Sequence, residues 1–171
     1  MNQAFNPQFA KIGEILIHNG KATESGINEA LAQQKTTNEK IGNTLVEMGL
    51  IEEDDFTTAY SQQLGYKKAD NFILLEADSQ VAALIPEDFA RENRVLGISS
   101  NDTTIVVAME DPDDVVSVDS IKRLTNLNPD IIVAGPTLLE SALDKVYGEI
   151  QKTAEVAETI DNITVISGEE G

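Results

Sequence analysis

Two acidic runs and one histidine are the residues of this chain whose types could support catalysis or metal binding. The runs are Glu52–Asp55 and Glu110–Asp114, and the histidine is His18. Each run stands where a helical pattern begins, and the helix dipole favours acidic side chains at that end. His18 falls on the polar side of a helical pattern, where an imidazole is ordinarily solvated. We therefore expect these residues to have structural roles rather than catalytic or metal-binding ones.

Other routes to catalysis are excluded by composition and motif. The sequence contains no cysteine, which removes disulfides, thiol catalysis and cysteine-ligated metals. It also contains no G-x-x-x-x-G-K-[ST] phosphate loop, no G-x-S-x-G and no H-E-x-x-H. The sequence therefore predicts a non-catalytic domain that requires no cofactor and no metal.

The net charge of −18 is distributed unevenly along the chain. Residues 1–68 carry −3 of it and residues 69–171 carry −15. Such a chain repels nucleic acid polymers and anionic membrane surfaces. It also has no apolar run long enough for a transmembrane helix and no secretion signal, so we expect a cytoplasmic protein without direct membrane insertion. An anionic ligand would find its most favourable surface on the nearly neutral first part.

A tandem repeat occupies that first part. Residues 11–34 and 40–63 align without a gap at an offset of 29 residues, and nine of the 24 aligned pairs are identical. This agreement is too extensive for chance and indicates a duplicated structural unit. The identical pairs are Lys11/Lys40, Ile12/Ile41, Gly13/Gly42, Leu16/Leu45, Gly20/Gly49, Glu24/Glu53, Ala30/Ala59, Gln33/Gln62 and Gln34/Gln63.

Each repeat predicts two short helices. Gly20 ends the first helix, because glycine readily adopts the left-handed backbone of a helix C-terminus, and Thr23 is suited to cap the second. Gly49 has the place of Gly20 in the second repeat, and Gly65 ends the last helix. We therefore expect four short helices over residues 11–65. Their predicted apolar faces are Ile12, Ile15 and Leu16, then Ile27, Ala30 and Leu31, and, in the second repeat, Phe56, Ala59 and Tyr60.

The pattern changes after Lys68. We expect a helical stretch over 78–92 broken at Pro86, a hairpin of strands 95–99 and 104–109, a helix over 111–125, a strand over 130–134 and a last helix from Pro136 to about Gly148. Residues 149–171 are acidic and predict a linker or tail. The predicted buried stripe of the 111–125 helix is Val115, Val118, Ile121 and Leu124.

Together these elements predict an α+β protein with two parts. The first, residues 1–68, is a four-short-helix tandem-repeat subdomain, and the second, residues 69–148, is a small three-stranded α+β subdomain. The strand, helix and strand of residues 104–134 fit a right-handed crossover between parallel strands.

Two features of the repeat exceed what a helical core requires. Gly13 and Gly42 stand in opening helical turns, where glycine costs about 0.8–1 kcal/mol relative to alanine. Glycine at such a place allows close approach of backbone or of a ligand. The glutamine pairs 33–34 and 62–63 are likewise not needed for a core. These positions predict a binding function for the repeat.

The duplicated frame resembles a known family. The pattern K-I-G-x-x-L, then a glycine, then an apolar-x-x-A-apolar-x-x-Q segment, is similar to the N-terminal domain of type II secretion and type IV pilus assembly ATPases. The segment 84–148, with its A-M-E-D-P stretch at 108–112, resembles that family's second N-terminal subdomain. The resemblance covers about residues 11–148. It implies a regulatory domain that precedes an ATPase motor domain and meets an inner-membrane platform protein, so that contact with the membrane is peripheral and through partners.

In part of that family the tandem repeat binds cyclic di-GMP, so the resemblance implies this ligand. Its two guanines and two phosphates are related by a twofold, which suits two equivalent half-sites. Lys11 stands where the family has arginine, and Phe56 and Tyr60 stand where it has leucines. The implied contact residues are Lys11, Ile12, Gly13, Leu16, Ile27, Leu31 and Gln34 in the first repeat, and Ile41, Gly42, Leu45, Phe56, Tyr60 and Gln63 in the second.

Two other interpretations stay open at this point. One is a protein-docking module that recruits the ATPase to the inner-membrane platform protein without binding nucleotide, with the acidic part of the chain facing a basic partner. The other is a free-standing adaptor, which differs only in whether an ATPase domain follows Gly171.

Overall fold

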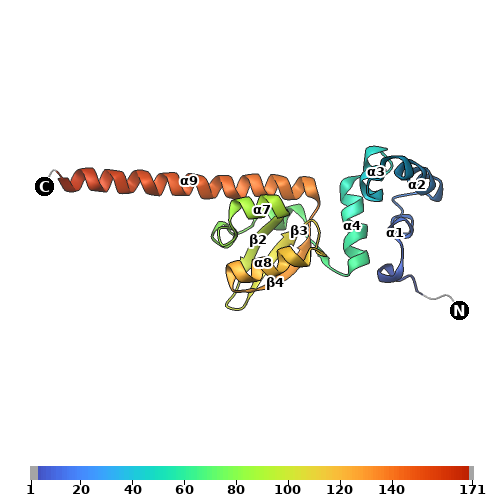
Figure 1. Cartoon of the computed structure of the whole chain (residues 1–171), viewed down its shortest axis with the longest axis horizontal. Helices are drawn as coiled ribbons and strands as arrows, with labels where there is room; N and C mark the ends of the chain where they lie inside the picture. The colour runs from blue at the N-terminus through green and yellow to red at the C-terminus, as the bar shows by residue number, and fades with distance from the viewer. Residues whose placement is uncertain (1–3, 170–171) are drawn as a thin grey trace. The chain divides into compact units, whose positions relative to one another are not determined.

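The computed structural model describes residues 4–169, and it describes side chains as far as Thr159 (Figure 1). The chain divides into two compact units, Met1–Lys68 and Ala69–Gly171. Helices make up the first unit, and the second contains a mixed sheet with helices around it. The α+β class predicted from the sequence is confirmed.

The first unit consists of the four short helices that the repeat predicts. They are α1 (Ile12–His18), α2 (Glu24–Thr37), α3 (Ile41–Glu47) and α4 (Glu53–Leu64), preceded by a single 3-10 turn, η1 (Pro7–Phe9). Gly20, Gly49 and Gly65 end helices with φ of 73°, 71° and 78°, as expected of left-handed caps. The Thr23 hydroxyl caps α2 by accepting the Gly26 N–H at 3.0 Å.

The packing of these helices relates the two repeats by a twofold. Helix α1 packs on α4, and α2 packs on α3. Helix α1 of the first repeat is equivalent to α3 of the second, and α2 is equivalent to α4. A twofold rotation that exchanges the repeats therefore turns the α1–α4 contact into the α3–α2 contact. A translation along a solenoid would not do so. The first unit is therefore built as two interlocked halves, each of which uses helices from both repeats.

A close approach between helices explains Gly13 and Gly42. A Cβ atom added at Gly13 would lie 3.0 Å from Cγ2 of Ile27, and one added at Gly42 would overlap the ring of Phe56. Both glycines are buried. The opening turns of α1 and α3 thus lie against α2 and α4 at a separation that only glycine permits.

The sheet has four strands in the order β1-β4-β3-β2, so the prediction of three strands was incomplete. Strands β2 (Val95–Ser100) and β3 (Thr104–Met109) form the predicted antiparallel hairpin. Strand β4 (Asn128–Val133) pairs with β3 in parallel, as expected for a crossover connection. The missed strand, β1 (Lys67–Lys68), has only two residues and lacks any alternating pattern.

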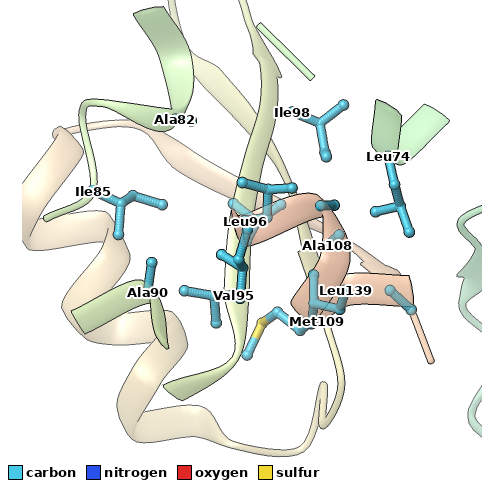
Figure 2. Close-up of a cluster of buried hydrophobic side chains, with 14 of the residues drawn as sticks. Leu74, Ala82, Ile85, Ala90, Val95, Leu96, Ile98, Ala108, Met109 and Leu139 are labelled. Carbon is cyan, nitrogen blue, oxygen red and sulfur yellow. The ribbon is translucent and has the colours of Figure 1, made fainter. Parts of the chain in front are cut away.

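Five helices belong to the second unit: α5 (Asn71–Leu75), α6 (Ser79–Ala82), α7 (Glu87–Asn93), α8 (Val115–Thr125) and α9 (Pro136–Glu169). Side chains from α5, α6, α7, β2, β3 and α9 meet in one hydrophobic core (Figure 2). Leu96, Met109 and Leu139 are completely buried there. Helix α5 was not predicted, because five residues are too few to show a helical period.

The buried face of α8 differs from the prediction. Val115 and Leu124 are 64% and 47% exposed, whereas Ile121 is buried as predicted and Val118 is half-buried. The reason is Ser117, which is buried with Ile121 and whose hydroxyl oxygen lies 2.5 Å from Oδ2 of Asp114 and 3.1 Å from Oδ1 of Asn93. A buried serine is invisible to an apolar pattern, so the predicted stripe was rotated away from the true one.

Helix α9 also extends further than predicted. Gly148 does not end it, since this glycine is not among those with a left-handed backbone, and the helix continues to Glu169 past α7 and the sheet (Figure 1). The predicted end of this helix near Gly148 is therefore wrong. Residues 149–169 are helical, residues 170–171 lie outside the described part, and a role as a linker or tail stays a prediction. Residues 149–158 contain good helix formers such as Gln151, Lys152 and Ala154.

The acidic runs take part in helix starts, as predicted. The Glu52 N–H donates to Oδ2 of Asp55 at 2.9 Å in a capping box, and the Asp114 carboxylate accepts the Ser117 N–H at 3.1 Å. Within the described residues, no group of three acidic or histidine side chains could hold a metal ion. In the same part of the chain, no helix is both long enough and apolar enough to cross a membrane.

Tyr147 on α9 anchors the core to the turn between α6 and α7. Its hydroxyl lies 2.7 Å from the Ile85 carbonyl oxygen and 3.0 Å from that of Ala82, and the residue is buried. Burial, reinforced by the nearby negative charge of Glu87, raises the pKa of Tyr147 to about 12. The neutral phenol is therefore the form that the fold stabilises.

We predict that Tyr147→Phe destabilises the second unit by about 1–2 kcal/mol, because the single hydroxyl proton that the Ile85 and Ala82 carbonyls share is lost. Because the pKa of Tyr147 is higher in the folded protein than in the unfolded chain, the unfolded tyrosine ionises first as the pH rises. The free energy of unfolding should therefore fall between about pH 10 and pH 12. The phenylalanine variant should lack this alkaline component. Urea unfolding at a series of alkaline pH values tests both effects, and an identical alkaline decline in the two proteins would contradict them.

We further predict that Gly42→Ala destabilises the first unit by about 1–2 kcal/mol, because overlap with the Phe56 ring outweighs the gain in helix propensity. Gly13→Ala should cost less, since an isoleucine side chain can shift by the few tenths of an ångström required.

The double variant Gly42→Ala/Phe56→Ile is the matched control for this prediction, because it replaces the phenylalanine ring by the isoleucine that faces Gly13 in the first repeat. Its loss of stability in thermal unfolding should be smaller than the sum of the two single losses. Simple additivity would show that the contact between Gly42 and Phe56 is not the cause.

Candidate functional site

The residues expected to contact a ligand all lie in the first unit, but they differ in accessibility. One group is buried in its core and holds the helices together. A second group is half-buried, and a third is exposed. The buried residues are Gly13, Leu16, Ile27, Gly42 and Leu45; the half-buried ones are Ile12, Gln34, Ile41, Phe56, Tyr60 and Gln63; the exposed ones are Lys11 and Leu31.

Burial assigns Leu16 and Leu45 to the framework. Both have no exposed surface, and both belong to the core cluster of the four helices together with Ile15, Ala30 and Ala59. Neither leucine reaches solvent in this conformation. Their place in the repeated frame is therefore explained by packing, and only the half-buried and exposed members have surface that a ligand could reach.

The two repeated glutamines have different surroundings. The Gln63 side-chain amide donates to the Ala10 carbonyl at 3.2 Å, which brings the end of α4 to the start of α1. Gln34 occupies the equivalent place on α2, next to the short connection into α3, and makes no side-chain hydrogen bond to any described residue. Each repeat's opening turn thus has a glutamine near it, and Gln34 keeps its full hydrogen-bonding capacity.

The lysines at the repeat starts carry positive charge available to an anion. Lys11 and Lys40 are exposed and form no ion pair with the part of the chain that the structure describes. By contrast, Lys21 lies 3.6 Å from Asp55, and Lys68 lies 2.6 Å from Asp54. Each repeat therefore begins with a cation that no described carboxylate neutralises.

Two acidic residues modify the surroundings of Lys40. The Glu39 pKa is raised, first by repulsion from Glu47 and then by desolvation and a hydrogen bond with the same residue. This repulsion within the pair disfavours full ionisation of both carboxyls. At mildly acidic pH the pair therefore places less negative charge beside Lys40 than two independent carboxylates would.

Several contacts of the first unit were not predicted from the sequence. Phe5 stacks on His18 with ring centroids 3.9 Å apart, and the Asn19 amide donates to Oε1 of Gln62 at 2.8 Å. The repeat does not reveal the second contact, because Met48 replaces Asn19 in the other copy.

A hollow of about 280 Å³ lies at the glycine turns that end α1 and α3. It is therefore at the opposite ends of these helices from Lys11 and Lys40, and it does not contain the predicted contact residues. Two of its three glycines, Gly20 and Gly49, are explained as helix ends, so the hollow is weaker evidence for a ligand site than the repeated frame. The lining residues are Gly20, Lys21, Ala22, Thr23, Gly26, Gly49 and Leu50.

Comparison with known proteins finds a family model that matches part of the chain. Residues 72–152 match the family model of the MshEN domain. The match falls in the second unit, and the tandem repeat lies outside it.

Two curated relatives are type IV pilus assembly ATPases PilB. The protein of Myxococcus xanthus is 28% identical over 161 residues, which cover 93% of this chain and 28% of the relative. The protein of Thermus thermophilus is 27% identical over 189 residues, which cover 89% of this chain and 21% of the relative. The chain thus spans about a quarter of the length of the curated relatives that it matches.

Solved structures extend the likeness over both units. A structure of MshE with cdg, or cyclic di-GMP, has a TM-score of 0.68 and 27% identity, and covers 81% of this chain and 99% of that one. The N-terminal domain of XpsE has a TM-score of 0.58 at 17% identity, covering 84% of this chain and 97% of that one, which shows a shared fold. The chain is therefore similar to MshEN domains over residues 72–152, and to MshE and the PilB ATPases over most of its length.

Proposed function

We propose that this chain is the non-catalytic regulatory domain of a cytoplasmic pilus or secretion ATPase, and that it binds cyclic di-GMP through the tandem repeat. The observation that carries the proposal is the twofold arrangement of the two repeats, in a chain whose structural neighbour MshE was solved with cyclic di-GMP. A ligand made of two identical nucleotides can make the same contacts twice on such a surface.

The chemistry of the accessible residues fits the ligand's parts. Lys11 and Lys40 offer one cation to each of two phosphates. The amide of Gln34 offers a donor and an acceptor to a base edge. Partly exposed apolar side chains, such as Ile12 and Ile41, offer packing surface for ribose and base faces.

Binding would affect the motor domain by making the four helices of the first unit more rigid. A molecule that contacts both repeats ties together helices α1 to α4, because each half of the unit uses helices from both repeats. The first unit would then present one fixed surface to a downstream ATPase motor domain. The proposal therefore includes regulation of that contact, with cyclic di-GMP as the signal.

Calorimetric titration of the purified chain with cyclic di-GMP tests the proposal. We predict saturable binding that weakens at high salt, and a loss of about fivefold to tenfold in affinity for Lys11→Ala and for Lys40→Ala, because each removes one charge-assisted contact. Lys122→Ala, the same change on an exposed residue of the second unit, should bind like the native chain. A folded native chain that gives no heat at high micromolar ligand would refute the proposal.

A second candidate function is protein docking without nucleotide, and one observation favours it. Val115 and Val116 at the start of α8 are 64% and 74% exposed, beside the exposed Asp113 and Asp119. Large apolar side chains exposed together often mark a contact surface. The acidic surroundings suit a basic segment of an inner-membrane platform protein, which would recruit the ATPase to the membrane.

Replacing both valines tests this second function. We predict that Val115→Ser/Val116→Ser weakens capture of a basic cytoplasmic fragment of the platform protein at least fivefold, while the native interaction is reduced by salt and unchanged by cyclic di-GMP. Val156→Ser, on an exposed part of α9, is the control for loss of an exposed valine. Equal capture by the native and double-variant proteins would exclude α8 as the docking surface.

A further inference from the structure

Among the differences between the two halves of the first unit, one pair of apolar side chains bears on ligand binding. On α2 the pair is Ile27 and Leu31, and on α4 the equivalent pair is Phe56 and Tyr60. The aromatic rings are stacked, with centroids 5.6 Å apart and an interplanar angle of 13°. The duplicated surface is thus aliphatic in one half and aromatic in the other.

The aromatic pair is held in a defined orientation. The Phe56 ring fills the space above Gly42 that a Cβ would need, so it cannot turn without moving α3. Tyr60 lies one helical turn further along α4, parallel to that ring, and is half-buried. A preorganised ring of this kind presents a flat face at little entropic cost.

The aliphatic pair offers a different surface. Ile27 is 8% exposed and is occupied by its contact with Gly13, whereas Leu31 is 42% exposed. A leucine side chain gives apolar contact without a planar face. A purine base stacked on an aromatic side chain gains roughly fivefold to a hundredfold in affinity, as judged from alanine substitutions.

The free hydrogen-bonding amide lies on the helix that lacks the aromatic pair. Helix α4, which carries the aromatic pair, has its Gln63 amide engaged by the Ala10 carbonyl. Helix α2, which carries the aliphatic pair, has Gln34 without a side-chain hydrogen bond to the described residues. One half therefore offers stacking and the other offers an unused amide.

We infer that the site binds its ligand asymmetrically: Tyr60, supported by Phe56, stacks on one guanine, and Gln34 hydrogen-bonds the other. This inference rests on the proposed binding of cyclic di-GMP and adds which residues distinguish the ligand's two bases. Tyr60 is the affinity-determining residue of the aromatic half, and Gln34 is that of the aliphatic half.

The first test compares equivalent residues by titration with cyclic di-GMP. Tyr60→Leu, which makes α4 resemble α2, should weaken binding about fivefold to thirtyfold, whereas Tyr60→Phe keeps the ring and should stay within about twofold of the native affinity. Gln34→Ala should weaken binding at least fivefold, and its repeat mate Gln63→Ala should weaken it less. Circular dichroism and thermal unfolding confirm that each variant is folded.

The second test reads the asymmetry directly by proton NMR of the bound ligand. Free cyclic di-GMP has equivalent guanines and gives one H8 signal. Bound to the native chain it should give two, one of them shifted upfield by the Tyr60 ring, and that shift should disappear in Tyr60→Leu under saturating ligand.

The outcomes separate the two proposals. A folded native chain that does not bind cyclic di-GMP refutes the proposed function, and the asymmetry with it. If the native chain binds, but gives a single H8 signal or keeps its affinity in Tyr60→Leu, the asymmetry alone is refuted and ligand binding stands. Equal losses for Gln34→Ala and Gln63→Ala likewise overturn the division of roles.

Discussion

The absence of a Cβ atom at two equivalent positions sets the geometry of the first unit. At Gly13 and Gly42 the opening turn of one helix lies directly against a side chain of the next, Ile27 in one repeat and Phe56 in the other. Those contacts fix the angle within each repeat, and the pairing of α1 with α4 and of α2 with α3 then interlocks the two repeats. The half-buried and exposed residues that could meet a ligand are positioned by this packing.

The same constraint separates two roles that are mixed in the repeated motif. The pairs Gly13/Gly42 and Leu16/Leu45 are identical between repeats because these residues are buried in the packing of the helices. Lys11, with its mate Lys40, is identical although exposed, and packing gives no reason for that. A repeated motif therefore combines residues kept for the fold with residues available for binding, and burial is the observation that distinguishes them.

Sequence reasoning succeeded where a local signal determines the structure. Glycine caps, the Thr23 cap and the repeat itself marked α1 to α4, and the alternating strands marked the hairpin of β2 and β3. It failed where tertiary contacts decide. Ser117 is buried where the apolar pattern predicts Val115 and Leu124, and α9 continues through Gly148 with a right-handed backbone. The choice between packing and ligand for Gly13 also required the Ile27 contact, which no sequence pattern reveals.

The strongly negative net charge does not decide whether an anion binds. In the second unit, the described contacts pair Arg91 with Asp144 at 2.6 Å and Arg94 with Glu110 at 3.3 Å, so these cations are already neutralised. Screening limits the reach of exposed charges to about 8 Å at physiological ionic strength, so a ligand responds to its immediate surroundings rather than to the total of −18. Those surroundings, at the starts of α1 and α3, hold Lys11 and Lys40 without ion pairs to described residues. The total charge of −18 therefore does not count against the proposed binding of an anionic ligand by the tandem repeat.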